Sequence, residues 1–394
     1  MKFGVNYTPR VGWFHHWVDY DPSEVARDFD TIKELGADHV RVFPLWPVFQ
    51  PNPTYVSPVA LRRLEETIAI AAERGLGVAV DGLQGHLSSF DFLPSWLLTW
   101  HRRNMFTDAF AMEATHRYLR DLAKACAGHD NVFALTIGNE VNQFTGAVHP
   151  EPHPATPRDI TLWLDTMLSA LREGAPGKDV LHSCYDASWY DDAQPFTLEH
   201  VARWGDITAV HAWVFNGTAQ RFGPDSFETR AHARYMVEVA RAFQVDPERP
   251  IWLQEIGAPR NVLPEASVEP FIRETVAQAA GAGLSGITWW CSHDVARGLG
   301  DYPELEYDLG LIDESGRIKR EGRIVAEAVA EAASAPVDRG AAALELDLAG
   351  DGGRAALAPG GSFWSDYMTT ARRFGHPRIT LVGDRVGLGG LAHA

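Results

Sequence analysis

The chain has 394 residues, of which 45% are apolar and 22% charged, a composition typical of a globular protein rather than a disordered or fibrous one. It carries 52 acidic against 35 basic residues, which gives a formal net charge of −17. This balance argues against nucleic acid and anionic membranes as partners, because both are bound by clustered lysine and arginine.

Short apolar runs alternate with amphipathic helical stretches from residue 2 to about residue 332. The predicted strands are, in chain order, Lys2–Tyr7, His39–Phe43, Gly77–Asp81, Val132–Gly138, Asp179–Ser183, Ile207–His211, Pro250–Glu255 and Gly286–Trp290. The helices predicted to follow them are Pro22–Leu35, Pro58–Arg74, Ala111–Cys126, Pro157–Arg172, Thr197–Val201, Ser226–Phe243, Val268–Ala282 and Arg320–Ala332. Asp21 as an N-cap and Gly36 as a stop signal bound the first helix.

Eight strand–helix units in succession predict a parallel sheet. A Rossmann sheet would carry a glycine-rich phosphate turn after its first strand, whereas here Asn6-Tyr7-Thr8-Pro9-Arg10 follows. The sequence therefore predicts an α/β protein with a (β/α)8 TIM barrel over residues 1–335.

Residues 336–394 are expected to form a small C-terminal α/β appendage without a catalytic role. We predict a strand at Ala343–Leu348, a helix at Ser362–Arg373 and a strand at Arg378–Val382, and expect Gly383–Ala394 to be frayed.

The connections that lead from helices into strands are short, whereas the loops that follow the strands are long. Long irregular loops in a compact domain are usually functional or disordered. The longest loops are 82–110, 139–156, 184–196, 212–225 and 291–319. All of them would lie at the C-terminal face of the barrel, where enzymes of this fold keep their active sites.

Two glutamates stand at the tips of predicted strands. Glu140 follows the fourth strand and Glu255 ends the seventh, each after a buried apolar run. A charge in such a place is costly unless it faces a site or a partner. Each glutamate alone would be ordinary, but the two together indicate a pair of catalytic carboxylates.

The Asn139-Glu140 pair, taken with Glu255, resembles the retaining glycoside hydrolases of the (β/α)8 4/7 superfamily, and within it family 5, the cellulase and mannanase family. The resemblance spans about residues 1–335. It implies that Glu140 is the acid/base, that Glu255 is the nucleophile and that Asn139 binds the sugar 2-hydroxyl.

The same resemblance implies roles for residues on other strands. Arg41 would lie beneath the nucleophile, His211 would follow strand six and His86 would loosely match a histidine after strand three. Trp290 would form an aromatic floor after strand eight, with Trp289 as the alternative.

The sequence departs from the family pattern at Trp213. Much of family 5 has a tyrosine at this place, two residues after the strand-six histidine, so a hydroxyl is missing here. We therefore expect Glu255 to be supported by Arg41 and another donor.

The residue types suit a double-displacement reaction, in which two carboxyl groups lie about 5–5.5 Å apart. We expect Arg41 to keep Glu255 ionised, and the charge of Glu255 to raise the pKa of Glu140. No cofactor is expected, and no metal, because the histidines lack a ligand spacing such as His-Glu-x-x-His.

Tryptophans stack on the apolar faces of sugar rings. The predicted site loops hold eight of the thirteen, and we expect these eight to form a sugar platform: Trp13, Trp17, Trp96, Trp100, Trp189, Trp213, Trp289 and Trp290. The expected partner is therefore a neutral oligosaccharide.

The location of the protein is predicted to be cytoplasmic. The N-terminal segment has no apolar region or cleavage site of a secretory signal, and the chain has no run of 18 apolar residues. Cys126, Cys184 and Cys291 lack the spacing of a disulfide framework and are expected to be buried thiols.

The long loops would form walls around the site. Together with a cytoplasmic location, these walls favour exo action on short imported oligosaccharides. The segments Asn6–Pro9, Phe43–Pro47 and Thr288–Asp294 resemble the family 5 branch of intracellular β-mannosidases, which is associated with Man-β-1,4-GlcNAc. The sequence thus predicts a retaining exo-β-mannosidase. Endo-β-mannanase and exo-β-glucosidase stay open, and the alternative from another class is an inactive carbohydrate-binding protein.

Overall fold

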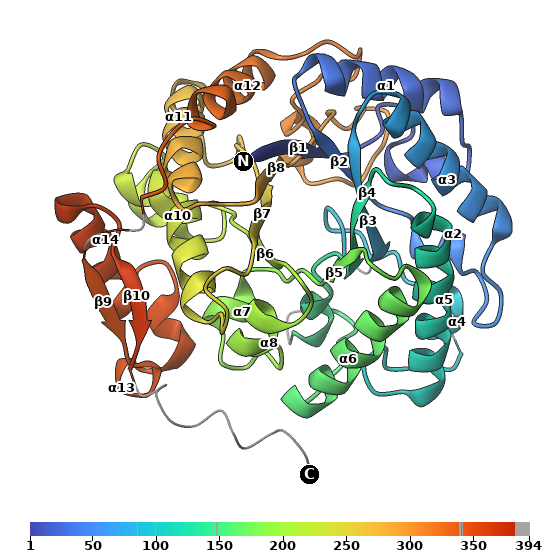
Figure 1. Ribbon diagram of the computed structural model, residues 1–394, viewed down its shortest axis with the longest axis horizontal. Helices are drawn as coiled ribbons and strands as arrows, with labels where there is room; N and C mark the ends of the chain where they lie inside the picture. The colour runs from blue at the N-terminus through green and yellow to red at the C-terminus, as the bar shows by residue number, and fades with distance from the viewer. Residues whose placement is uncertain (85, 99, 147–148, 339, 341, 383–394) are drawn as a thin grey trace.

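The computed structural model describes residues 1–382 except 85, 99, 147–148, 339 and 341, so the segment expected to fray, 383–394, lies outside the described residues. The chain forms a barrel of eight parallel strands with helices around it and a small α/β unit at one side (Figure 1). The strands are β1 Lys2–Asn6, β2 His39–Val42, β3 Gly77–Leu83, β4 Val132–Gly138, β5 Asp179–Leu181, β6 Thr208–His211, β7 Ile251–Ile256 and β8 Gly286–Trp289.

The order of strands in the sheet is β5-β4-β3-β2-β1-β8-β7-β6. Strand β1 pairs with both β2 and β8, so the first and last strands of the eight meet. They do so in a barrel but not in a doubly wound sheet. The predicted (β/α)8 fold is confirmed.

The ladder has one seam, between β5 and β6, which lie at its two ends. At this seam the amide of Val180 donates to Oδ2 of Asp206 at 2.8 Å, and the carbonyl of Val180 accepts from the Asp206 amide at 2.7 Å. The edge of β5 is therefore bonded to the turn that leads into β6.

Eight helices alternate with the strands: α1 Pro22–Glu34, α3 Pro58–Glu73, α5 Ala109–Ala127, α6 Pro157–Gly174, α8 Leu198–Arg203, α10 Phe227–Ala242, α11 Glu265–Gly281 and α12 Arg320–Ala332. Six of them begin at a side chain that accepts a hydrogen bond from a backbone amide of the first turn: Asp21, Ser57, Asp108, Thr156, Thr197 and Ser226. These caps explain why the helix starts are readable from the sequence.

The loops predicted as irregular contain short helices of four or five residues. They are η1 Trp13–Trp17, α2 Trp46–Phe49, α4 Ser95–Leu98, η2 Val141–Thr145, α7 Ala187–Tyr190, α9 Thr218–Phe222 and η3 Glu304–Asp308. One turn of helix shows no periodicity in a sequence, which is why none was predicted.

The C-terminal unit contains β9 Ala343–Leu346, α13 Leu348–Asp351, η4 Gly353–Leu357, α14 Ser362–Phe374 and β10 Arg378–Leu381, with β9 parallel to β10. It packs on α10 (Figure 1). There Tyr235 is fully buried, donates its hydroxyl to the carbonyl of Leu357 at 2.8 Å and packs on Tyr367 with ring centroids 4.9 Å apart.

Among the described residues, no helix is both long and apolar enough to cross a membrane. Cys126, Cys184 and Cys291 are buried, and each is a free thiol.

Candidate active site

Both predicted catalytic glutamates lie at the C-terminal mouth of the barrel, each almost fully buried. Glu255 belongs to β7, and Glu140 comes two residues after β4. Glu140 has a positive φ of 43°, in the left-handed region, at the point where the chain turns from β4 into η2. Such strained conformations cluster at functional sites because the surrounding structure must hold them.

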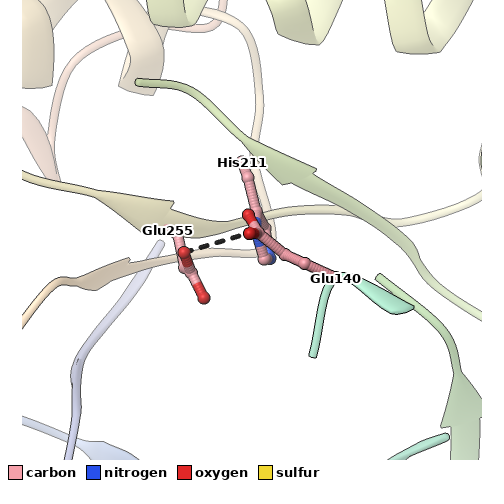
Figure 2. Close-up of side chains that lie close together, drawn as sticks. All are labelled: Glu140, His211 and Glu255. Atoms are coloured by element: carbon pink, nitrogen blue, oxygen red, sulfur yellow. Dashed lines mark hydrogen bonds and ion pairs between the residues drawn. The ribbon is translucent and has the colours of Figure 1, made fainter. Parts of the chain in front are cut away.

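The imidazole of His211, at the end of β6, lies beside both carboxylates (Figure 2). Its Nδ1 is 2.6 Å from Oε1 of Glu140 and 3.3 Å from Oε2 of Glu255. Single ligating atoms of the three side chains all lie within 4.8 Å of one another. The two carboxylates are thus close enough to act on the two sides of one bond.

Arg41 of β2 lies beneath this group, fully buried, as the family resemblance implied. One of its terminal nitrogens donates to Oε1 of Glu255 at 2.7 Å and to Oδ1 of Asn6 at 3.1 Å. The other donates to Oδ1 of Asn139 at 2.8 Å and to the carboxylate of Asp81. Arg41 therefore orients Glu255 and Asn139 together.

Trp213 provides the second donor to the nucleophile position. Its Nε1 lies 3.3 Å from Oε2 of Glu255 and donates to it, at the place where much of family 5 has a tyrosine hydroxyl. The substitution thus replaces one hydrogen-bond donor with another. The indole also stacks on Phe215, with ring centroids 4.9 Å apart.

Asn139 is held by two hydrogen bonds. Its Oδ1 accepts from Arg41, and its Nδ2 donates to the backbone carbonyl of His86 at 2.8 Å. His86 also lines the pocket above the two glutamates that is described below. Its Nδ1 lies 3.4 Å from Oδ1 of Asp91. These contacts join the loop after β3 to the end of β4.

The protonation pattern differs from the one expected from the sequence. Although burial raises the pKa of Glu140, the hydrogen bond and charge of His211 outweigh it and lower the pKa of Glu140. Burial raises the pKa of Glu255, and the charge of Glu140 adds to this, against the opposing charges of His211 and Arg41. The sequence could not show that an imidazole would stand between the two carboxyls.

Two glutamines complete the hydrogen bonding of this pair, and neither was predicted. Nε2 of Gln143 donates to Oε2 of Glu140 at 2.6 Å. Nε2 of His211 donates to Oε1 of Gln254 at 3.0 Å, which leaves Nδ1 to face Glu140. The only available signal for Gln254 was its position beside Glu255 at the end of a strand.

Above the carboxylates is a pocket of about 320 Å³. One wall comes from the loops after β3 and β8, through His86, Ser88, Trp290 and Glu306. The opposite wall comes from the loops after β4, β5 and β6, and its side chains are Gln143, Tyr185 and Phe215. The pocket has the size of the smaller small-molecule sites, which run from about 300 to 1,000 Å³.

The predicted platform of eight tryptophans is wrong. Trp213 and Trp290 line the pocket, so the register at strand eight selects Trp290 rather than Trp289. The other six do not line it: Trp13, Trp17, Trp96, Trp189 and Trp289 are buried, and Trp100 is 92% exposed. Four of the buried rings belong to short loop helices, Trp13 and Trp17 to η1, Trp96 to α4 and Trp189 to α7, while Trp289 belongs to strand β8.

The trio of Glu140, His211 and Glu255 has the spacing of a metal-ligand group, which the sequence did not predict. The atoms that would bind an ion are already used, since Nδ1 of His211 bonds to Glu140 and Arg41 bonds to Glu255. A cation would also lie next to the Arg41 guanidinium. The contacts fit a proton-transfer site better than a metal site.

Solved structures similar to this chain include glycosidases. A GH5_18 glutamate-to-alanine variant from Streptomyces cattleya, in complex with Manβ1-4GlcNAc, is 50% identical, with a TM-score of 0.94 over 97% of this chain and 94% of that one. A GH5_18 variant from Bifidobacterium longum subsp. longum, in complex with the same disaccharide, is 44% identical, with a TM-score of 0.93 over 97% and 91% of the two chains.

A third similar structure is an exo-β-1,4-mannosidase from an Opitutaceae bacterium. It is 26% identical, with a TM-score of 0.71 over 88% of this chain and 62% of that one. No protein-family model matches the chain, and no curated protein sequence does.

Proposed function

Because the chain belongs to glycoside hydrolase family 5, subfamily 18, we propose that it is a retaining exo-β-mannosidase that acts on short β-mannosides such as Manβ1-4GlcNAc. The observation that supports this best is the pair of buried carboxylates, Glu140 and Glu255, at the base of a small pocket with walls on both sides.

The spacing of the two carboxylates favours retention of configuration. Oxygens of Glu140 and Glu255 lie within 4.8 Å of each other. Retaining enzymes hold their two carboxyl groups about 5–5.5 Å apart, whereas inverting enzymes need about 6.5–9.5 Å to admit a water.

In the first step, Glu140 donates a proton to the glycosidic oxygen while Glu255 attacks the anomeric carbon and the leaving sugar departs. The hydrogen bonds from Arg41 and Trp213 hold Glu255 in one orientation for this attack. In the second step, Glu140 takes a proton from a water molecule whose oxygen attacks the anomeric carbon, and the bond between that carbon and Glu255 breaks, which releases the sugar.

The supply of the acid proton involves His211. Burial lowers the pKa of His211, but the charge of Glu255 and the hydrogen bond and charge of Glu140 outweigh this and raise it. Glu140 and His211 are 2.6 Å apart, so they share one proton that can move to Glu140 when the glycosidic oxygen arrives.

Exo action is supported by the pocket. A volume of about 320 Å³ suits a short ligand better than a long polymer. Asn139, held by Arg41 and the His86 carbonyl, is proposed to bind the 2-hydroxyl whose configuration distinguishes mannose from glucose.

We propose a cytoplasmic location for this reaction. Three buried free thiols are usual in a reducing compartment, and short oligosaccharides are the form in which carbohydrate reaches a cell interior. Cell fractionation with an assay of p-nitrophenyl β-mannoside hydrolysis would test this, and activity confined to the medium would contradict it.

The assignment of the two glutamates is tested by Glu255→Ala and Glu140→Ala, with folding checked by thermal melting. Each substitution should lower kcat by about 10³-fold or more, because it removes a group that acts only in the transition state. Azide should rescue Glu255→Ala with an α-mannosyl azide as product, and Glu140→Ala with a β-mannosyl azide.

The two azide products identify which glutamate is the nucleophile, because azide replaces the missing carboxylate on its own face of the sugar. Products of the opposite configuration would exchange the two roles. A panel of p-nitrophenyl β-mannoside, β-glucoside and β-galactoside tests the sugar, and preference for the glucoside would contradict the proposed specificity.

A further inference from the structure

We propose that Glu306 is a specificity-determining residue that accepts hydrogen bonds from hydroxyl groups of the terminal sugar, at the end of the pocket away from the leaving group. This inference rests on the proposed function and extends it. Glu306 belongs to η3, in the long loop after β8, and it has no role in the two-carboxylate reaction.

The carboxyl of Glu306 is buried and opens into the same pocket as the two catalytic glutamates. Nε1 of Trp290 donates to its Oε2 at 3.3 Å, and the Ser88 hydroxyl is a second polar neighbour. Among the residues that the structure describes, Glu306 forms no ion pair with Lys, Arg or His, although the charge of His86 opposes the rise of its pKa. An ionised carboxylate has about four acceptor positions, so about two of those on Glu306 are left for a ligand.

Such a residue does not serve the stability of the fold. Burial raises the pKa of Glu306 to about 7, and the charge of Glu255 adds to the effect. A buried carboxyl without a cationic partner is costly to ionise. A glutamine or an apolar residue would fill this place at a lower cost, which points to a use in ligand binding.

The position of Glu306 indicates which part of the substrate it meets. Glu140 must reach the glycosidic oxygen, and its own neighbours in the pocket, Gln143 and Tyr185, stand on the wall formed by the loops after β4 and β5. The leaving sugar therefore lies toward that wall. Glu306 stands on the other wall with Trp290 and Ser88, which is the side of the terminal sugar.

The loop that carries Glu306 is anchored by packed aromatic rings. Tyr302, four residues before Glu306, contacts Trp13 and Phe90 with ring centroids 4.7 Å away in each case. A carboxylate held in such a loop can bind free hydroxyl groups of a chain end. A hydroxyl substituted by another sugar has no proton to donate, so the same contact would also select against internal residues of a polymer.

The test compares Glu306→Ala and Glu306→Gln with the wild type on p-nitrophenyl β-mannoside and on its 3-, 4- and 6-deoxy analogues. The wild type should lose about 10- to 100-fold in kcat/KM on the analogue that lacks the contacted hydroxyl. Glu306→Ala should lose a similar factor on the parent substrate and no further factor on that analogue. The kcat/KM values of Glu306→Gln should lie between those of the wild type and Glu306→Ala.

The matched control is Glu304→Ala, on the same short helix, where the side chain is 78% exposed. In Glu304→Ala, the loss in kcat/KM on each deoxy analogue relative to the parent substrate should equal that of the wild type. The inference would be overturned if the wild type and both Glu306 variants lost the same factor in kcat/KM on each deoxy analogue. A wild-type enzyme inactive on the parent β-mannoside would instead overturn the proposed function.

Discussion

The hydrogen bond from Nε2 of His211 to Gln254 decides which imidazole nitrogen faces Glu140. With Nε2 protonated, Nδ1 either takes the proton of Glu140 or returns it across 2.6 Å. Since the acid step needs one proton on this pair, the alkaline limb of the pH profile of kcat/KM should report its loss.

Substitution of Gln254 should therefore move that limb in a direction set by the new side chain. Gln254→Leu removes an acceptor that favours the imidazolium, so the limb should move to lower pH; Gln254→Glu provides a charged acceptor, so it should move to higher pH. The measurement is kcat/KM for p-nitrophenyl β-mannoside between pH 4 and 9. Shifts of the same sign in both variants would contradict this role of Gln254.

Asp186 is a second buried acid near the pair, with Asn216 donating to its Oδ2 at 3.0 Å. Burial raises the pKa of Asp186 to about 7, with the charge of Glu140 adding to it. In the unfolded chain an aspartate ionises near pH 4. Between about pH 4 and 7 the folded state therefore binds more protons, so the stability contributed by Asp186 falls as the pH rises.

Asp186→Asn should abolish this fall in folding stability with rising pH. Relative to the wild type, its free energy of unfolding should rise between pH 5 and pH 8 by about 1–3 kcal/mol, measured by urea denaturation at both values. Asp130→Asn, at an exposed position, is the control and should show no such pH dependence. An equal effect of Asp186→Asn at both pH values would refute the expected linkage.

Site residues that are charged and stand in or next to an apolar strand were predictable from the sequence. Polar site residues at positions where polar residues are common were not. Arg41 and Glu255 interrupt apolar strands, Glu140 directly follows one, and the structure brings the three together. Gln254 and Glu306 look like any polar residue near a strand or in a loop. Their importance depends on strand register and on the path of a long loop, neither of which a single sequence fixes.

At the scale of elements, the C-terminal unit braces one wall of the pocket through Arg354, which stands in η4. Its guanidinium donates to the backbone carbonyls of Ser188, Asp191 and Phe196 at 3.0, 3.1 and 2.8 Å. These carbonyls belong to α7 and the chain after it. The same loop contains Tyr185, which lines the pocket on the proposed leaving-group side.

Arg354→Ala should therefore weaken binding of the leaving sugar. We expect the KM for Manβ1-4GlcNAc to rise about 3- to 10-fold, the effect of one or two lost hydrogen bonds, with a smaller change for p-nitrophenyl β-mannoside. Steady-state kinetics on both substrates measures this. Arg373→Ala, at an exposed position on α14, is the control, and equal rises of KM on both substrates in Arg354→Ala would count against the brace.

The ends of the barrel elements were predicted to within three residues, because caps and apolar runs mark them. The helix at Pro157–Gly174 has Thr156 and Asp159 bonded reciprocally at its start, a local signal that tertiary packing does not change. The one-turn helices of the loops have no such signal. This is also why the tryptophans of those loops were assigned to the wrong surface.

At the scale of the whole molecule, we propose a division after residue 335, between the barrel and a C-terminal unit whose described residues cover α10. A fragment of residues 1–335 would expose Tyr235, which is fully buried against Leu357 and Tyr367. Its thermal midpoint should fall by about 5 °C or more, since uncovering even one large apolar side chain costs about 1.5–3 kcal/mol. Differential scanning calorimetry tests this, and an unchanged midpoint would contradict the proposed role of the appendage.

The seam between β5 and β6 has a consequence for how molecules of this protein meet one another in concentrated solution. A sheet edge with free amides and carbonyls is a template for strands of other chains and thus for aggregation. At this edge the amide and the carbonyl of Val180 are both occupied by Asp206. One aspartate in the turn before β6 therefore occupies both backbone groups of Val180, so a strand from a neighbouring molecule cannot pair with them.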